Sequence, residues 1–182
     1  MDEKEIALRC SRGDNVARKM LYEQYAGQLM AMCLRYFTDQ ESAKDVLHDA
    51  FIRIFRTMDS YEFRGDGSLR AWLNKVTLSV IIRQIQIDNQ NKEVTIADWG
   101  QMEERVEEEN VQEIPQKVLM HLIQELPRQM RMVLNLYVFE RKSHKEIGDI
   151  LGISDRTSSS ELSRARVLLM EKIKQYKNKK NQ

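Results

Sequence analysis

With 182 residues, 42% of them hydrophobic and 31% charged, the chain has the composition of a soluble, helix-rich protein of one or two domains. Its formal net charge of +1 argues against a protein that binds duplex DNA tightly by itself, because such proteins neutralise many phosphates with lysine and arginine. No apolar run is long enough to cross a membrane, the charged N-terminal segment carries no signal peptide, and Cys10 and Cys33 lack metal-ligand spacing, so we expect a cytoplasmic protein with reduced thiols and no cofactor.

The first predicted helix runs from about Val16 to Phe37, because its apolar residues recur at steps of three and four. These residues should form one buried face: Leu21, Tyr25, Leu29, Met32 and Tyr36. Thr38 and Glu41 have the spacing of a capping box and predict the start of a second helix, which extends to about Met58. Its expected buried stripe consists of Ala43, Val46, Leu47, Ala50, Phe51, Ile54, Phe55 and Met58.

The opposite face of the second helix combines one apolar residue with polar and charged ones: Asp45, His48, Asp49, Ile52, Arg53 and Arg56. Ile52 is the apolar member of this set. An apolar centre with a charged rim is typical of a protein-binding surface, although a single exposed apolar side chain is also common where nothing binds.

Residues 60–68, SYEFRGDGS, are predicted to form a loop, because two glycines and mixed charges interrupt the helical pattern. Ser68 can cap a third helix, which extends from Leu69 to about Gln86. Its expected buried residues are Leu69, Trp72, Leu73, Val76 and Val80. The stretch 76–82 favours a strand by residue propensity, but its flanks have helical periodicity, so we expect a helix.

An acidic segment, Asp88 to Ile114, follows and lacks steady periodicity. Between Asp88 and Glu113 there are nine acidic residues and two basic ones, whereas from Arg141 onward there are eleven Lys or Arg and five Asp or Glu. This composition predicts a linker, part-helical near residues 103–111, that joins two helical domains.

Two short helices are predicted after the linker. Pro115 suits the first turn of one, whose inward residues should be Val118, Leu119, Leu122 and Ile123. Pro127 precedes the other, which runs from Arg128 to about Phe139. The last six residues, KNKKNQ, are expected to form a frayed basic tail.

Residues 143–169 have the pattern of a helix-turn-helix. Ser143 and Glu146 form a capping box, and Gly152 permits the left-handed turn that ends the first helix. Ser154 can cap the second helix. Its expected buried stripe is Leu162, Ala165 and Leu169, which leaves Arg156, Ser159, Ser160, Ser163 and Arg164 outward. Such a helix can enter a major groove, whereas an ordinary helical hairpin is the alternative for this segment taken alone.

These segments, in this order, resemble the extracytoplasmic-function (ECF) sigma factors of bacterial RNA polymerase. DVLHDAFIRIFR (45–56) is similar to the core-binding helix of that family, and SYEFRGDGSLRAWL (60–73) is similar to the start of its minus-ten segment. LPRQMRMVLNLYVFERKSHKEIGDILGIS and LSRAR are similar to its C-terminal domain, which recognises the minus-thirty-five element. The resemblance implies an all-helical fold with two domains, residues 1–87 and 115–182, joined by an acidic linker, residues 88–114.

The resemblance also implies three sets of binding residues and no catalytic residue. Core polymerase is expected to contact Asp45, His48, Asp49, Ile52, Arg53 and Arg56. Melted minus-ten DNA, with one base flipped into the 60–68 loop, is expected to contact Tyr61, Phe63, Arg64, Asn74, Lys75, Ser79 and Arg83. The minus-thirty-five element is expected to contact Lys145, Arg156, Thr157, Ser159, Ser160, Ser163, Arg164 and Arg166. The linker is expected to occupy the RNA path, although solvated acidic linkers are also common, and an anti-sigma factor is a further implied partner.

The chain departs from the family pattern in three places. His48 and Asp49 replace the usual Gln-Glu pair of the core-binding helix. On the minus-ten helix, where Arg-Asn and Asp-Arg are frequent, the chain has Leu78, Ser79, Arg83 and Gln84. The recognition helix has RTSSSEL (156–162) where G-T-V-K-S-R-L is common, and the gain of Glu161 should weaken phosphate contacts.

Two other interpretations remain open on the sequence. A stand-alone helix-turn-helix transcriptional regulator predicts a symmetric dimer and tight duplex binding, but the chain shows no dimerisation heptads. An all-helical adaptor that never touches DNA fits the depleted basic positions. An enzyme is disfavoured, because His48, His121 and His144 share no motif and no phosphate loop, nucleophile elbow or metal cluster is present.

Overall fold

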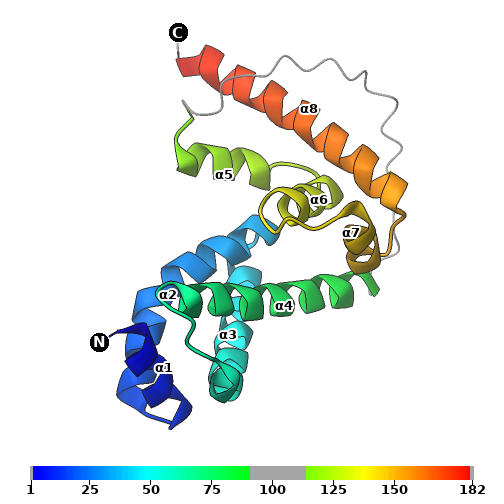
Figure 1. Cartoon of the computed structure of the whole chain (residues 1–182). Helices are drawn as coiled ribbons and strands as arrows, with labels where there is room; N and C mark the ends of the chain where they lie inside the picture. Colours follow the sequence, from blue (N-terminus) through cyan, green and yellow to red (C-terminus); the bar gives the residue numbers. More distant parts are fainter. Residues whose placement is uncertain (1, 91–113, 181–182) are drawn as a thin grey trace. The chain divides into compact units, whose positions relative to one another are not determined.

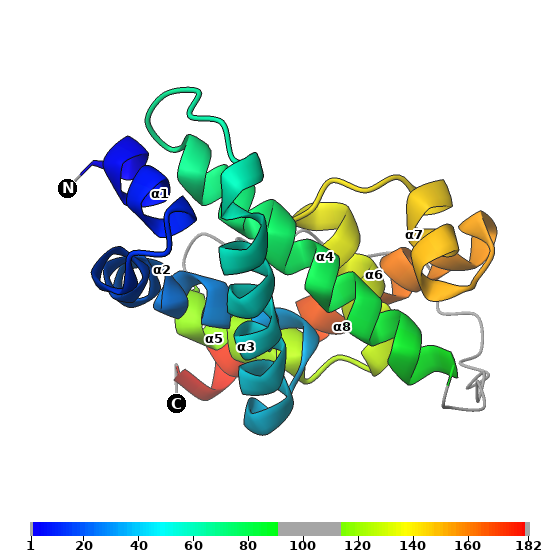
Figure 2. The same cartoon turned by 90° about the horizontal axis from the view of Figure 1, so that it is seen from below.

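The computed structural model describes residues 2–90 and 114–180, and every regular element in this part of the chain is a helix (Figures 1 and 2). The chain divides into two compact units, Met1–Ile87 and Asp88–Gln182, each with its own core. The all-helical, two-domain prediction is therefore confirmed. No helix in the described ranges is long and apolar enough to span a membrane.

Unit 1 contains α1 (Glu3–Ser11), α2 (Asn15–Tyr36), α3 (Gln40–Thr57), the 3-10 helix η1 (Met58–Ser60) and most of α4 (Ser68–Gln90). Helices α1, α2 and α3 pack against one another. The five apolar residues predicted to line one face of α2 are all buried, and so is the α3 stripe, except that Phe55 is only half-buried. Helical spacing of apolar residues therefore predicted the centre of this core correctly.

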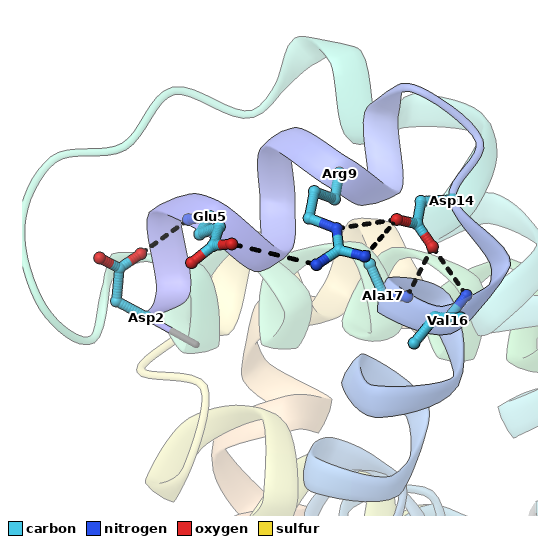
Figure 3. Close-up of polar contacts among 6 residues, drawn as sticks. All are labelled: Asp2, Glu5, Arg9, Asp14, Val16 and Ala17. Atoms are coloured by element: carbon cyan, nitrogen blue, oxygen red, sulfur yellow. Dashed lines mark hydrogen bonds and ion pairs between the residues drawn. The ribbon is translucent and has the colours of Figure 1, made fainter.

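Helix α1 was not predicted from the sequence, and its corner with α2 is built around one ion pair (Figure 3). Nε and Nη2 of Arg9 lie 2.7 and 2.6 Å from Oδ2 of Asp14. The other carboxylate oxygen of Asp14 accepts hydrogen bonds from the amides of Val16 and Ala17, which caps α2. These hydrogen bonds lower the pKa of Asp14, and the bond from Arg9 has the largest effect. The Asp14 side chain thus caps the start of α2 and, through Arg9, holds α1 beside it.

Two predicted helix starts in unit 1 are wrong by one residue. Helix α3 is capped by Asp39, not Thr38, because the Asp39 carboxylate accepts from the amide and the hydroxyl of Ser42 at 2.8 and 2.7 Å. Ser68 does not cap α4 but is its first helical residue.

The buried face of α4 is rotated relative to the prediction. Trp72 and Val76, which we expected in the core, are half-buried. Val80 is buried as predicted, and the fully buried positions beyond Leu73 are Thr77, Ile81 and Ile85. The helical assignment of 76–82 is confirmed, because packing of this face overrides the strand propensity of its β-branched residues.

Most of the predicted linker lies outside the described residues. Its first three residues, 88–90, are helical and belong to α4, and its last, Ile114, is buried. The predicted part-helical segment at 103–111 also lies outside the described residues.

Unit 2 contains α5 (Gln116–Gln124), α6 (Arg128–Val138), α7 (His144–Leu151) and α8 (Asp155–Lys180), and the first three pack against α8. Leu122 and Ile123 of α5 are buried, whereas Val118 and Leu119 are half-buried. The tail expected to fray is helical as far as Lys180.

Two contacts hold the C-terminal part of α8 in place. Ile173 is buried, and the ammonium group of Lys172 lies 2.7 Å from a carboxylate oxygen of Glu125. This ion pair joins α8 to the C-cap residue of α5, five positions before the tail that the sequence predicted to fray.

The turn between α7 and α8 has the predicted caps. Ser143 and Glu146 form the capping box, Gly152 has φ +71°, and Ser154 accepts from the Thr157 amide at 3.0 Å. Gly148 has a second role, since a Cβ added there would lie 2.6 Å from the carbonyl oxygen of Ile153. The absence of a side chain at Gly148 therefore lets α7 approach the turn closely.

Candidate nucleic-acid interface

The surface of α3 that faces away from the core carries all six residues predicted to bind a protein partner. All six are exposed: Asp45, His48, Asp49, Ile52, Arg53 and Arg56. We call this surface the α3 face. Ile52 is 38% exposed, although the neighbouring Phe51 and Ile54 fill the core. The sequence therefore separated the buried and exposed sides of this helix correctly, and Ile52 offers apolar area at the centre of a charged rim.

The loop formed by residues 61–67, which we call the 61–67 loop, joins η1 to α4. Its first residue is fixed, because the Tyr61 hydroxyl and Ser68 Oγ lie 2.6 Å apart and the Tyr61 and Trp72 ring centroids are 5.6 Å apart. Ser68 Oγ also accepts from the Arg64 amide at 3.2 Å. Phe63 is 40% exposed. The loop thus presents one aromatic ring while it holds another against α4.

Four predicted minus-ten residues lie on α4, and the structure gives them different environments. Lys75 and Arg83 are exposed, and Ser79 lies between them at four-residue spacing, so the three share one face. The Ser79 hydroxyl, however, donates to the carbonyl of Val76 at 2.6 Å. Asn74 is off this stripe and accepts from Gln28 of α2 at 2.9 Å.

The predicted recognition helix is the N-terminal part of α8, and its hydroxyl-rich side is exposed. Arg156, Ser159, Ser160 and Arg166, together with Lys145 of α7, are exposed, while Thr157, Ser163 and Arg164 are half-buried. Several hydroxyls already have local bonds: Thr157 Oγ1 lies 2.8 Å from Ser154 Oγ, and Ser160 donates to the Thr157 carbonyl at 3.0 Å. Arg156 is the exposed cation nearest the start of the helix.

Glu161 does not point outward, which corrects the expectation that it opposes phosphate contact directly. It is only 8% exposed, and one of its oxygens lies 3.4 Å from Nη1 of Arg164. Burial raises the pKa of Glu161, and Arg164 opposes that rise. Glu161 lies three residues after the buried Ser158, on the edge of the buried stripe, which the predicted stripe of Leu162, Ala165 and Leu169 did not include. Arg164 is therefore partly held by an internal partner.

A chain of contacts behind the recognition helix was missed from the sequence. Ser158 is fully buried, and its hydroxyl lies 3.0 Å from Nδ1 of His144. The His144 ring stacks on Tyr137 at 4.8 Å between centroids, and the guanidinium of Arg166 lies 5.8 Å from the centroid of the same tyrosine ring. These contacts connect α6, α7 and α8, and the only sequence signal for them was a histidine beside a helix cap.

The described residues contain no group of three or more His, Cys, Asp or Glu side chains that could hold a metal ion. Cys10 and Cys33 are buried free thiols. Burial raises the pKa of both and brings that of Cys33 to about 12. Both side chains are therefore neutral core residues.

Two family models match the chain, one in each unit. Residues 21–88 match Sigma-70 region 2, and residues 116–169 match Sigma-70, region 4. The RNA polymerase sigma-H factor of Pseudomonas aeruginosa is 25% identical over 175 residues and covers 90% of each chain. The ECF RNA polymerase sigma-E factor of Escherichia coli K12 is 24% identical over 184 residues and covers 95% of each chain.

Two solved structures of protein complexes are also similar. The sigma factor RpoE in complex with the anti-sigma factor NepR, from Bartonella quintana, matches with a TM-score of 0.47 and 20% identity over 86% of this chain and 96% of that one. CnrH in complex with the cytosolic domain of CnrY matches with a TM-score of 0.45 and 19% identity over 94% of this chain and 97% of that one.

The family matches lie on the segments that the sequence motifs had singled out, in the same order along the chain. They do not favour the stand-alone regulator, since region 2 has no place in that interpretation. Because regions 2 and 4 together span more than half of the sequence and full-length relatives are sigma factors, the chain belongs to the sigma-70 family of RNA polymerase sigma factors, in its extracytoplasmic-function group.

Proposed function

We propose that this sigma factor binds bacterial core RNA polymerase through the α3 face. The observation that carries this proposal is the exposure of all six residues of that face on a helix whose other side fills the core. Ile52 supplies apolar area at the centre, and the charged residues around it can steer association and fix its orientation. Residues 1–87 would then form the domain that binds core polymerase and the minus-ten element.

The same domain would melt the minus-ten element by trapping a displaced base at the 61–67 loop. An exposed aromatic ring such as Phe63 can stack on an unpaired base of any type, and Arg64 beside it can contact a phosphate. Lys75 and Arg83 lie on the exposed stripe of α4, where they can follow the backbone of the separated strand. This arrangement favours single-stranded over duplex DNA.

Residues 115–182 would recognise the minus-thirty-five element through the start of α8. Arg156 has the exposure needed for bidentate contact with a guanine, and the neighbouring serines can contact several bases. Residues 88–114 would connect the two domains inside polymerase, where the nine acidic side chains suit a positively charged channel. Polymerase supplies the active site, so the sigma factor itself would catalyse no reaction. It would act in the cytoplasm. Control by an anti-sigma factor remains a prediction from the family resemblance.

The test combines the full chain, bacterial core polymerase and promoter DNA. The chain and core polymerase together should initiate transcription at defined sites, whereas the chain alone should bind promoter duplex only weakly, because its net charge is +1. Fluorescence anisotropy with labelled chain measures core binding, and run-off transcription measures initiation. Nanomolar binding of promoter duplex by the isolated chain at physiological salt, without initiation when core polymerase is added, would contradict the proposal.

A further inference from the structure

The carboxylate of Glu3 joins α1 to the last residue of the 61–67 loop and to the first turn of α4. One oxygen accepts hydrogen bonds from the amides of Gly67 and Leu69 at 2.9 and 3.3 Å, and the other accepts from the hydroxyl of Tyr25 at 3.2 Å. Residue 3 is therefore bonded to groups more than 60 positions later in the chain. The bonded amides flank Ser68, the first residue of α4, and a negative charge at a helix start also interacts favourably with the helix dipole.

Burial, together with the nearby Glu3 carboxylate, raises the pKa of Tyr25 to about 12. The Tyr25 hydroxyl is thus protonated at neutral pH and remains a donor to Glu3. Ile6, Ala7 and Cys10 of α1 are buried. At the far end of α1, Arg9 is tied to the cap of α2 (Figure 3). Both ends of α1 are therefore held by side-chain contacts, which fix the position of the helix that carries Glu3.

The loop itself has few other constraints. Gly65 and Gly67 have φ values of +106° and +83°, so the backbone at these points has the conformational freedom of glycine. Ser68 holds the first half of the loop through Tyr61 and the Arg64 amide. In the second half, the Ser68 amide donates to the carbonyl of Gly65 at 3.1 Å, and the Gly67 amide donates to Glu3, the bond that joins the loop to α1.

Lys4 adds a second contact from α1 to the same loop. Its ammonium nitrogen lies 6.0 Å from the centroid of the Phe63 ring, at the outer limit of a cation–π contact. Phe63 nevertheless remains exposed. Helix α1 thus contacts the loop both at its last residue and at its presented aromatic ring.

We infer that Glu3 is a positioning residue for promoter melting: it holds the 61–67 loop in the conformation that presents Phe63 and Arg64 to the displaced minus-ten base. This inference rests on the proposed role of the loop. Glu3 contacts no DNA in this proposal and acts through the backbone of Gly67. It lies on α1, away from the six residues of the α3 face, so core binding should not depend on it.

The test uses the full chain bound to core polymerase and a fluorescent single-stranded oligonucleotide that carries the non-template minus-ten sequence. Glu3→Ala removes both acceptors, and we expect the affinity for the oligonucleotide to fall about tenfold, as when a charge-assisted hydrogen bond is lost. Glu3→Gln keeps a carbonyl oxygen for the two amides, and its amide group can donate to Tyr25, so affinity should recover to within about threefold of the original. Glu5→Ala is the matched control, because Glu5 is also in the first turn of α1 but its carboxylate pairs, among the described residues, with Arg9, at 4.0 Å.

Core-polymerase affinity and binding of a minus-thirty-five duplex should be the same for all these variants. The inference is overturned if Glu3→Ala binds the oligonucleotide normally, or if it loses core and duplex binding equally, which would make Glu3 a general folding residue. The Phe63→Ala variant distinguishes failure of this inference from failure of the proposed function. If Phe63→Ala loses oligonucleotide binding and Glu3→Ala does not, only the inference fails. If Phe63→Ala also binds normally, the loop does not hold the base and both fail.

Discussion

Replacing Ile52 with aspartate tests the α3 face, because it changes the centre of that face without entering the core. Ile52 is 38% exposed in the free protein, and the α3 stripe behind it is formed by other residues. We therefore expect the melting temperature of unit 1 to stay nearly unchanged, as for most exposed substitutions.

The effect on core binding can be estimated from the exposed fraction. Complete burial of an isoleucine contributes about 1.5–3 kcal/mol, so the 38% still open to a partner corresponds to about 0.6–1.1 kcal/mol. A carboxylate left without a partner at a buried interface costs a further ~1–3 kcal/mol. Together these losses weaken core binding by about 15- to 1,000-fold for Ile52→Asp. Ile52→Ala removes only apolar area and should weaken it by at most about sixfold.

Fluorescence anisotropy of labelled variants titrated with core polymerase measures these affinities, and thermal unfolding followed by circular dichroism checks the fold. Val16→Asp is the control, since Val16 is 62% exposed and lies in the first turn of α2, where an acidic residue is tolerated. The reasoning is refuted if Ile52→Asp unfolds the domain, which would make Ile52 a core residue. It is equally refuted if the folded variant binds core polymerase as tightly as the Val16→Asp control.

Three further predictions concern unit 2. Arg156→Ala should cost about 1–3 kcal/mol of promoter binding and relax preference at one base pair, measured by anisotropy on promoter variants; equal losses on all sequences would mean phosphate contact only. Glu161→Gln should release Arg164 and steepen the salt dependence of promoter binding by about one phosphate contact, and an unchanged slope would show that Arg164 stays away from DNA. Hydrogen bonds from Ser143 and Lys142 lower the pKa of Glu146 from 4.5 to about 2, so its stabilising effect is complete above pH 4.5 and lost as the pH falls through about 2. Thermal unfolding across this range should depend less on pH for Glu146→Gln, and an identical profile would contradict the assignment.

The exposed side of α3 was predictable because eight apolar residues at helical spacing define the buried side. Ile52 and its neighbours lie between these positions and therefore face away from the core. The helix-turn-helix was predictable for a similar reason, since its caps at Ser143 and Ser154 and its left-handed glycine at position 152 are local chemistry. Both sets of features depend only on residues a few positions apart.

The features that were missed depend on contacts between distant segments or on residues at the edge of a stripe. Helix α1 has nine residues with three buried ones, too few for a periodic signal, and it is held by Arg9 and Asp14 across a turn. The bond from Glu3 to Gly67 leaves no trace in local sequence. Glu161 was expected to weaken phosphate contacts, but it is buried at the edge of the stripe, where Arg164 offsets part of the cost of its burial.

The close contact at Gly148 has a consequence for how promoter preference can diverge among relatives. Because any side chain at this position would meet the carbonyl oxygen of Ile153, the angle between α7 and α8 cannot drift through substitutions there. In the proposed minus-thirty-five contact, divergence is left to the exposed side chains of α8, such as Arg156, Ser159 and Ser160. Duplicated copies of such a gene could thus acquire new target genes through a few surface codons, while inheriting the same scaffold intact.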